Sequence, residues 1–539
     1  MPLDLLITGR IATLSGTSGY GWVEAVGIRG GRVAFAGSEI ELETRADPFT
    51  HRIVLEPDEI AMPGMTDAHL HLADAAMAAE QVDLSGAATL EAGLAALVER
   101  AAAQPDPESW IEGGGWDQRR WGRWPTVADL ERVAPGRLVA LWSFDHHALW
   151  VSETALRAAG LGRETPDPPG GLIQRLPDGS PAGVLLENAC PLVSGRIPAP
   201  SAGQLERAIE AFSHRLLALG VVAVHDPAGI TADPDLSGAF AAYASLAASD
   251  RLPVRVHACL RSEALSTATD RGFRSGAPLG PPDGRAKVGW LKLFADGTLG
   301  SQTAATLDPI PPDETHGLFR MTPAELADYA AQAAAAGIAS QIHAIGDHAV
   351  RAALDALEPT AGRVPLMPRL EHVQLVHPDD RPRFAAAGIA ASVQPVHLRD
   401  DAATARRDWG DRAERDGYAW RTLADSGALI PFGTDAPVEP IDPWPGLAMA
   451  ALRRSPSWPA GTPPFGPAEA LPLDRVLRAA CLDGPLTAHE TDRGRLVPGQ
   501  RGDVVVVPGD AFGDRPDPGS IEGSRPRLVL VDGEVVFEA

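Results

Sequence analysis

Asp67-Ala68-His69-Leu70-His71 follows an apolar run, Ile60 to Met65, that has the composition of a short strand. Residues two apart on a strand point to the same side, so His69 and His71 are expected to leave the strand end together and to bind one metal ion. By itself the His-x-His pattern is as consistent with coincidence or a surface pair as with metal binding. Its interpretation therefore depends on the other metal-binding residue types in the chain.

Lysine is almost absent from the sequence. The 47 Lys plus Arg residues include only Lys287 and Lys292, and Lys292 stands in an apolar, strand-like run from Gly289 to Gly297. Arginine stays charged, whereas a buried lysine changes its pKa readily and can become a neutral amine. Such an amine can add carbon dioxide and form a carbamate that bridges two metals. A lysine paired with a nearby carboxylate is an equally good interpretation.

Composition excludes several classes of protein. The 539 residues are 45% hydrophobic and 22% charged, which is typical of a globular chain with ample core. The net charge of −24 argues against nucleic-acid or anionic-membrane partners. Three widely spaced cysteines predict no disulfide framework, and neither a signal peptide nor a membrane helix is evident. We expect a cytoplasmic enzyme with a small-molecule substrate, and a homodimer on base rates.

Both ends of the chain have β-strand patterns. Gly30-Gly31 separates two short apolar runs, and Asp532-Gly533 separates two more, as in hairpins. The sequence predicts that residues 1–58 and 490–539 form one composite β-sandwich domain.

Between these ends, strands alternate with helices such as 201–219, and a capping box opens a helix at Thr322. Counting from the His69 strand gives eight strands, which predicts an α/β fold with a (β/α)8 TIM-like barrel from residues 59–74 and 199–489. Residues able to bind metal fall at or just past the carboxyl ends of these strands, where barrel enzymes build their sites. They are His69, His71, His225, His257, Lys292, His343, His372 and Asp435.

Residues 75–198 form an insertion after barrel strand 1, a position suited to a lid. We expect a helix at 90–103, a turn at 113–117 and a strand-like segment at 138–144. Trp116 is a candidate substrate contact, although its packing in a small core of the insertion is the more ordinary interpretation. His146 and His147, beside Asp145, are weaker candidates from the same region.

The ordered motifs are distinctive as a set. They are His69-Leu-His71, Lys292-Leu-Phe-Ala-Asp-Gly-Thr-Leu-Gly-Ser301, His343-Ala-Ile-Gly-Asp347, Leu370-Glu-His-Val-Gln374 and Gly433-Thr-Asp-Ala-Pro437. The chain resembles the metal-dependent amidohydrolase superfamily over nearly its whole length. Within it, the likeness is to amidohydrolase family 3, which includes N-substituted formamide deformylases.

The resemblance implies a binuclear centre, with zinc the expected metal. His69 and His71 would bind one ion, and carboxylated Lys292 would bridge to a second ion held by His343 and His372. Asp435 would complete the first site and act as general base in the hydrolysis of a carbon–nitrogen bond.

Other interpretations remain open at the level of sequence. One is a mononuclear deaminase in which Lys292 is structural, and another is a non-catalytic barrel. His225 and His316 are tentative substrate contacts, although a buried supporting or core histidine is the more ordinary interpretation of His225. Asp435 could be an ordinary turn residue before Ala436-Pro437.

Overall fold

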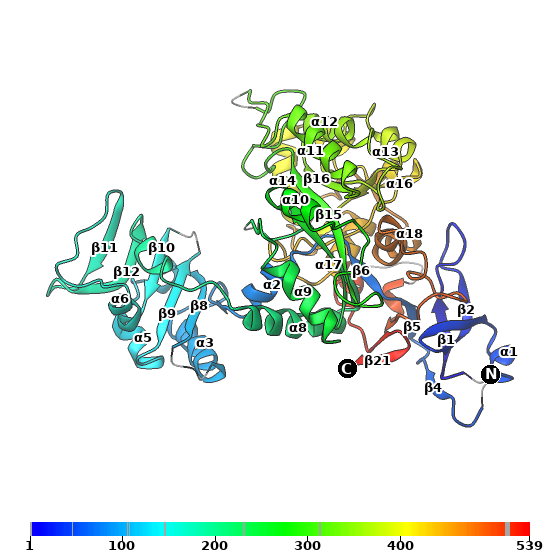
Figure 1. The fold of residues 1–539 in the computed structure, drawn as a ribbon, viewed down its shortest axis with the longest axis horizontal. Coiled ribbons are helices and arrows are strands. Elements are labelled where there is room, and N and C mark those ends of the chain that lie inside the picture. The colour runs from blue at the N-terminus through cyan, green and yellow to red at the C-terminus, as the bar shows by residue number, and fades with distance from the viewer. Residues whose placement is uncertain are drawn as a thin grey trace. The chain divides into compact units, whose positions relative to one another are not determined.

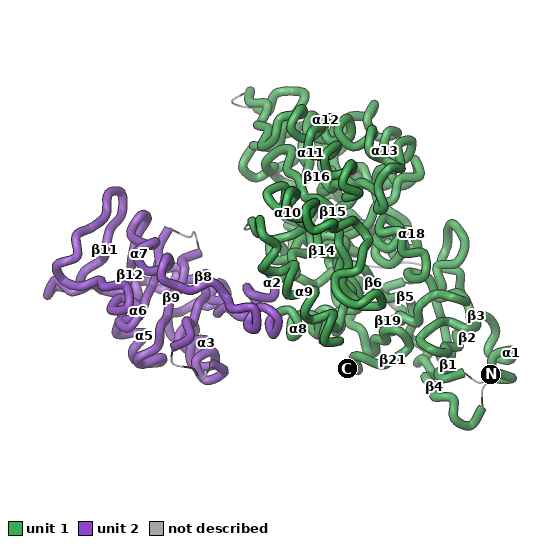
Figure 2. Tube along the Cα trace, in the orientation of Figure 1, with its two compact units in different colours: residues 1–75, 209–539 green, residues 76–208 purple. Residues whose placement is uncertain are grey.

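The computed structural model describes residues 3–45, 47–104, 106, 108–144, 147–229, 232–311, 314–512 and 518–539 (Figure 1). The chain divides into two compact units: residues 1–75 with 209–539, and residues 76–208 (Figure 2). The first unit contains two of the sheets formed by the described residues, and the second contains another. His146 and Asp145 lie outside the described residues.

Strands from both ends of the chain form one eight-stranded sheet, in the order β21-β20-β19-β5-β1-β2-β3 with β4 beside β1. Strand β19 pairs antiparallel with β5 and so joins the two ends. The predicted hairpins are present: β2 pairs with β3 across Gly30-Gly31, and β20 with β21 across Asp532-Gly533. The strands are β1 (Leu5–Ala12), β2 (Trp22–Arg29), β3 (Arg32–Gly37), β4 (His51–Val54), β5 (Glu59–Pro63), β19 (Val504–Pro508), β20 (Leu528–Val531) and β21 (Glu534–Glu538).

The apolar run before the histidine pair forms two strands, and the expectation of one strand is wrong. β5 belongs to the sheet of the chain ends, whereas β6 (Met65–Asp67) pairs with β13 in a different, parallel sheet. The change of sheet occurs at Gly64, where a Cβ would lie 2.6 Å from Cγ2 of Val222. Only a residue without a side chain lets the backbone pass this close, so glycine permits the crossing.

The parallel sheet has the order β6-β13-β14-β15-β16-β17-β18, in which sequence neighbours are also spatial neighbours. Helices separate most of its strands, as the alternating pattern predicts: α9 (Ala239–Ala248), α10 (Leu265–Asp270), α11 (Pro323–Ala335), α12 (Asp347–Leu357) and α13 (Arg381–Ala387). The helix α8 (Ala202–Ala218) precedes β13, and α11 begins with the predicted Thr322–Glu325 capping box. The strands are β13 (Val221–Asp226), β14 (Arg255–Arg261), β15 (Ala286–Phe294), β16 (Ser340–Ala344), β17 (Arg369–His372) and β18 (Ala390–Ser392).

The segment 429–433, expected as the eighth strand, bonds to both edges of this sheet. Beyond β18, the N–H of Val393 donates to the carbonyl of Pro431 at 3.0 Å, and Val393 pairs with Phe432 as an isolated parallel bridge. At the other edge, the N–H of Ala68 donates to the carbonyl of Phe432 at 2.8 Å. The sheet is therefore a curled parallel sheet whose two edges share one bridging segment. Downstream helices include α14 (Leu398–Trp409), α16 (Trp420–Asp425), α17 (Trp444–Leu452) and α18 (Leu473–Arg478).

Residues 76–208 contain a mixed six-stranded sheet, in the order β11-β12-β10-β9-β8-β7. The predicted helix is α3 (Leu90–Ala103), but the predicted turn at 113–117 is wrong because Gly113 to Trp116 belong to β8. A Cβ on Gly113 would lie 2.2 Å from the carbonyl oxygen of Val82, so its glycines let β8 approach β7. The strands are β7 (Val82–Asp83), β8 (Trp110–Trp116), β9 (Leu138–Ser143), β10 (Ala148–Val151), β11 (Gly171–Arg175) and β12 (Pro181–Glu187).

In the part of the chain that the structure describes, no helix combines the length and the apolar composition required to traverse a bilayer.

Candidate metal centre

One cavity of about 590 Å³ collects the side chains that the sequence singled out as metal ligands. It lies at the carboxyl ends of the parallel strands, and its lining includes two histidines that follow β6, one residue each from β15, β16 and β17, and one that follows the segment 429–433. These residues are His69, His71, Lys292, His343, His372 and Asp435. Their convergence in one cavity results from the fold, because the first and the last of them, His69 and Asp435, are 366 positions apart in the sequence.

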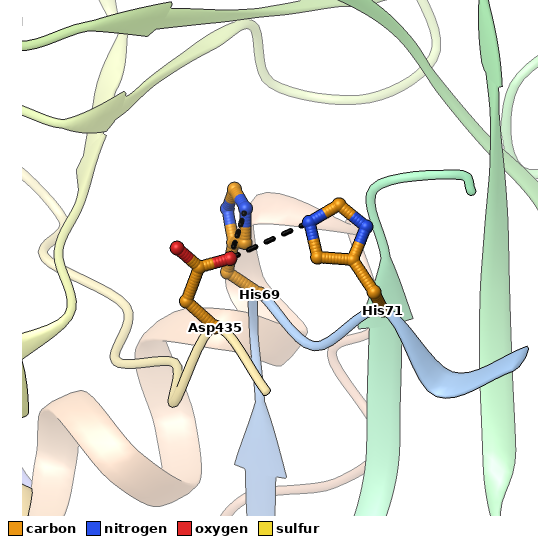
Figure 3. Close-up of side chains that lie close together, drawn as sticks. All are labelled: His69, His71 and Asp435. Carbon is orange, nitrogen blue, oxygen red and sulfur yellow. Dashed lines mark ion pairs between the residues drawn. The ribbon is translucent and has the colours of Figure 1, made fainter. Parts of the chain in front are cut away.

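His69, His71 and Asp435 form the tightest group (Figure 3). The Nε2 atoms of His69 and His71 lie 3.3 and 3.4 Å from the same carboxylate oxygen, Oδ1 of Asp435. All three side chains are buried. Two imidazoles and a carboxylate at this spacing are a typical donor set for a divalent ion.

A hydrogen bond on one side of the His71 ring determines which of its two nitrogens is available to a metal ion. The Nδ1 atom of His71 lies 2.6 Å from the carbonyl oxygen of Ala228, which can only accept, so Nδ1 carries the proton. In neutral His71 the lone pair is then on Nε2, which faces Oδ1 of Asp435. Two acceptors that face each other in a buried site repel unless a proton or a cation lies between them. The residues present therefore fit a bound metal ion.

His343 and His372 approach the same cavity from β16 and β17, with ring centroids 4.5 Å apart. The Nε2 atom of His343 lies 2.9 Å from the carbonyl oxygen of Gly297, so the proton is on Nε2 and the lone pair on Nδ1. Burial lowers the pKa of His343 to about 3, which keeps the ring neutral and able to bind metal. The Nδ1 atom of His372 is buried and has no hydrogen-bond partner among the described residues.

Lys292 is buried at the end of β15, and its Nζ lies 5.0 Å from the ring centroid of Phe294. Burial lowers the pKa of this amine to about 8, although the nearby carboxylates of Glu371 and Asp435 oppose the shift. Within the described ranges, no carboxylate is within 4 Å of Nζ. The simple pairing of Lys292 with a carboxylate is therefore not observed.

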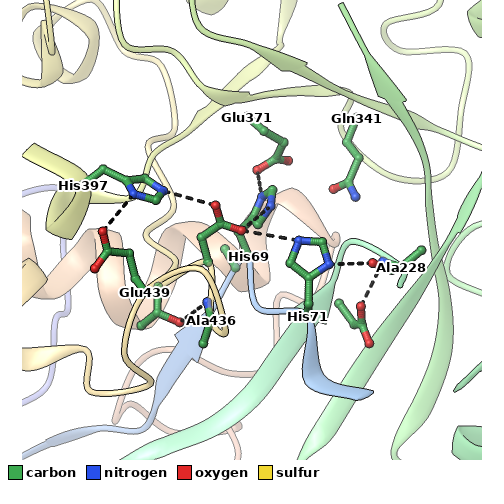
Figure 4. Close-up of polar contacts among 12 residues, drawn as sticks. His69, His71, Ala228, Gln341, Glu371, His397, Ala436 and Glu439 are labelled. Atoms are coloured by element: carbon green, nitrogen blue, oxygen red, sulfur yellow. Dashed lines mark hydrogen bonds and ion pairs between the residues drawn. The ribbon is translucent and has the colours of Figure 1, made fainter. Parts of the chain in front are cut away.

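A carboxylate that the sequence analysis missed supports His69 from behind (Figure 4). Oε2 of Glu371 lies 2.5 Å from Nδ1 of His69, and Oε1 lies 2.7 Å from Nε of Arg369. Arg369 is fully buried and also donates to the side-chain oxygen of Gln341 and to the carbonyl of Ala68. Carboxylates often hold ligand histidines in place around metals. In the sequence, the position of Glu371 directly before His372 was the feature that could have identified it.

The loop that carries Asp435 is attached to the histidine loop through backbone contacts. The N–H of Asp435 donates to the carbonyl of His69 at 2.6 Å, and Thr434 donates its N–H and hydroxyl to the carboxylate of Asp67. Burial by itself would raise the pKa of Asp435, but His69, His397 and His71 outweigh it and hold the pKa well below its usual value. The carboxylate of Asp435 is therefore held against the histidines of the cavity, and its lowered pKa favours the ionised form.

His397 is a second residue that the sequence analysis missed. It lies in a 3-10 turn (Pro395–His397) after β18, with Nε2 3.2 Å from Oδ2 of Asp435 and Nδ1 3.4 Å from Oε1 of Glu439. Burial lowers the pKa of His397, but hydrogen bonds to these two carboxylates outweigh it and raise the pKa to about 10. His372, His397 and Asp435 form a second compact group of ligand atoms, whereas His343 is in neither group. A histidine just past a parallel strand was the missed signal.

The structure gives the tentative substrate contacts other roles. His225 is fully buried, accepts from Nη1 of Arg369 at 2.9 Å, and does not line the cavity. His316 is exposed, and its Nδ1 lies 3.0 Å from the carbonyl oxygen of Thr306. Trp116 is fully buried in the core of residues 76–208, where Nε1 donates to the carbonyl of Leu141. None of these three tentative substrate contacts is among the residues that line the described cavity.

His257 and His147 also have partners away from the cavity. The Nε2 atom of His257 lies 3.7 Å from the carboxylate of Glu490, and the Nδ1 atom of His147 lies 3.0 Å from that of Glu187.

The curled parallel sheet, with histidines and carboxylates at its carboxyl edge, defines an α/β enzyme of the kind that places its chemistry at the strand ends. A profile of the amidohydrolase family matches residues 58–537, and the chain belongs to this family. It is accordingly a hydrolase of the amidohydrolase superfamily, as the motifs implied.

Three similar proteins illustrate this relationship. The YtcJ protein of Bacillus subtilis (strain 168) is 30% identical over 520 residues, which cover 96% of each chain. The N-substituted formamide deformylase of Arthrobacter pascens is 26% identical and covers 94% of this chain and 93% of its own. The crystal structure of an uncharacterised metal-dependent hydrolase from Pyrococcus furiosus superposes with a TM-score of 0.73 at 26% identity, over 94% of this chain and 100% of that one.

Proposed function

We propose that the protein is a metal-dependent amidohydrolase that cleaves a non-peptide carbon–nitrogen bond, in an amide, formamide or cyclic amide, of a small molecule. The observation that carries this proposal is the single cavity lined by the six expected ligands, with Nε2 of His69 and His71 facing the same oxygen of Asp435. The names of two relatives support it, since one is a formamide deformylase and another a metal-dependent hydrolase.

The ligand assignment follows the donor chemistry. His69 and His71 would hold one ion with Asp435, and His343 and His372 would hold a second. Carboxylation of Lys292 would add the two oxygens that bridge them, and the pKa of about 8 makes the neutral amine accessible near neutral pH. Imidazole and carboxylate ligands in tetrahedral or similar geometry favour zinc, which lowers the pKa of a bound water to about 7 and polarises a carbonyl.

Asp435 is the residue proposed to move the proton. Its carboxylate is ionised and buried, and His397 holds Oδ2 while Oδ1 faces His69 and His71. In hydrolysis it would accept a proton from the attacking water and then return it to the leaving nitrogen. Glu371 keeps the Nδ1 proton of His69 in place, which leaves Nε2 as the ligand atom.

The proposal includes the architecture expected from the sequence. Residues 59–74 and 199–489 would form the (β/α)8 barrel, closed by the segment 429–433, and residues 1–58 and 490–539 the β-sandwich. The hydrogen bonds of Val393 and Ala68 to that segment support closure.

A mononuclear hydrolase, in which His372 or His397 assists the leaving group, is the second candidate. It is favoured by one observation: His69, His71 and Asp435 form a complete group without His343.

Metal content separates these alternatives. We expect about two zinc ions per chain in metal-replete protein, and loss of both ions and activity in His69→Ala. His316→Ala, an exposed histidine outside the cavity, is the matched control and should retain both. Activity would be screened over N-formyl, N-acyl and cyclic amides. One ion per chain would support the mononuclear candidate, and metal-free protein with an intact fold would overturn the proposal.

A further inference from the structure

Two arginines stack on one phenylalanine in the wall of the cavity. The Cζ atoms of Arg320 and Arg261 lie 4.7 and 5.2 Å from the ring centroid of Phe294, and all three residues line the cavity. Phe294 is in turn adjacent to the metal centre, since its centroid is 5.0 Å from Nζ of Lys292 and 5.6 Å from the ring of His343. One aromatic ring therefore contacts both guanidinium groups and also lies next to the expected reacting centre.

The carboxylates of the same cavity are already engaged by other groups. Asp401 accepts hydrogen bonds from the hydroxyl of Tyr418 and from Nε2 of Gln374, both at 3.0 Å. Glu439 accepts from Nη2 of Arg399 at 2.8 Å, and Asp435 is held by histidines. Among the described residues none of the three forms an ion pair with Arg320, although opposite charges in one cavity would attract each other.

Arg320 has no carboxylate partner in the described part of the chain, and its backbone N–H is fixed to the carbonyl of Ala295. Arg261 is largely buried and keeps 3.4 Å contacts to Glu263 and to the carbonyl of Gly229. A guanidinium that packs its face on an aromatic ring keeps its N–H donors at its edge, in the fork geometry that matches a carboxylate. The stacking thus fixes the orientation of Arg320 without using its donors.

We infer that Arg320 and Arg261 form a subsite for an anionic group on the substrate, and that the protein acts on amides that carry a carboxylate away from the scissile bond. This inference rests on the proposed function and adds the substrate class to it. A chain with a net charge of −24 repels anions at long range, so local cations are required to admit one. Because Phe294 contacts both arginines as well as Lys292 and His343, the arginines are close enough to the metal centre to limit the spacing between the carboxylate and the amide.

Equilibrium binding tests the subsite without requiring hydrolysis. The probes are N-methanesulfonyl amino acids from glycine to aminohexanoic acid, whose sulfonamide is not cleaved, each compared with its primary carboxamide by titration calorimetry on the metal-replete protein. We expect one chain length for which the acid binds roughly tenfold to a hundredfold more tightly than the carboxamide, as for a hydrogen bond to a charged group. Added salt should weaken binding of the acid and leave the carboxamide unchanged.

Arg320→Gln should abolish the preference for the acid, and Arg320→Lys should restore only part of it because lysine cannot form the bidentate pair. Arg45→Gln is the matched control, since Arg45 also stacks on a phenylalanine, Phe35, but outside the cavity. Equal binding of acid and carboxamide at every length, or a preference that survives Arg320→Gln, would overturn the inference. Hydrolysis of an uncharged formamide by the wild-type protein tests the proposed function separately from the subsite, because that substrate has no carboxylate for the arginines to bind.

Discussion

Oε2 of Glu371 lies 2.5 Å from Nδ1 of His69, and both residues are fully buried. This contact joins the residue that precedes one expected metal ligand, His372, to another ligand that is 302 positions earlier in the chain. Because a carboxylate accepts the Nδ1 proton, it leaves the Nε2 lone pair of His69 for a metal.

Glu371→Gln should lower metal affinity and activity by roughly 10- to 100-fold, the usual loss when a carboxylate that supports a ligand histidine is removed. Two quantities would be measured: the loss of zinc in competition with a chelator, and kcat/KM. The control is Glu99→Gln, a change at an exposed glutamate of α3. Unchanged zinc affinity in Glu371→Gln would show that the contact has no role in metal binding.

Lys292→Ala should lose most activity and should regain part of it when acetate or propionate is added. A short carboxylate can occupy the space left by the side chain and replace the two oxygens of the carbamate. Metal content should fall toward one ion per chain and recover with the added acid. If Lys292 were only structural, added carboxylates would leave both activity and metal content unchanged.

Gly433→Ala should disturb the site through the backbone. A Cβ on Gly433 would lie 2.5 Å from the backbone nitrogen of His69, which cannot move without its strand. We expect destabilisation of about 1–3 kcal/mol, measured by urea unfolding, with reduced zinc content. Gly162→Ala is the matched control because a Cβ there meets nothing within 4 Å. Wild-type stability and zinc content in Gly433→Ala would contradict the close approach of Gly433 to the backbone of His69.

Glu490 provides a prediction about pH that does not involve the metal centre. It is buried against Nζ of Lys287 at 2.7 Å and Nε of Arg493 at 2.5 Å. Burial alone would raise its pKa, but Arg493, His257 and Lys287 outweigh it, so the folded-state pKa is well below the ordinary 4.5. A depressed carboxylate pKa stabilises the folded state above pH 4.5 and loses this contribution as the pH falls toward the folded-state value.

Glu490→Gln should therefore cost roughly 3 kcal/mol at neutral pH. This is the lower end of the range for a broken buried pair, because the side chain of Lys287 is 34% exposed. The difference from wild type should shrink as the pH is lowered below 4.5. Urea unfolding at several pH values would measure it, and a difference that stays constant with pH would contradict the assignment.

Local signals in the sequence predicted much of the secondary structure. The Gly30-Gly31 and Asp532-Gly533 hairpins, the helix at 90–103 and the Thr322 capping box are present because turn and capping preferences depend on a few neighbouring residues. Local signals failed where contacts between distant residues determine the secondary structure. Gly64 divides an apolar run between two sheets, and the glycines of β8 serve close strand packing, which no local pattern distinguishes from a turn.

Composition and short-range spacing were enough to predict the order of the motifs, the repeated strand–helix pattern and the residue types able to bind metal. The folded chain was needed to show which of the 15 histidines face the cavity. It added Glu371 and His397 to the site, and it assigned His225, His316 and Trp116 to other surroundings. The physical reason is that a ligand site depends on distances between side chains that come from separate strands, and these distances exist only once the sheet has formed.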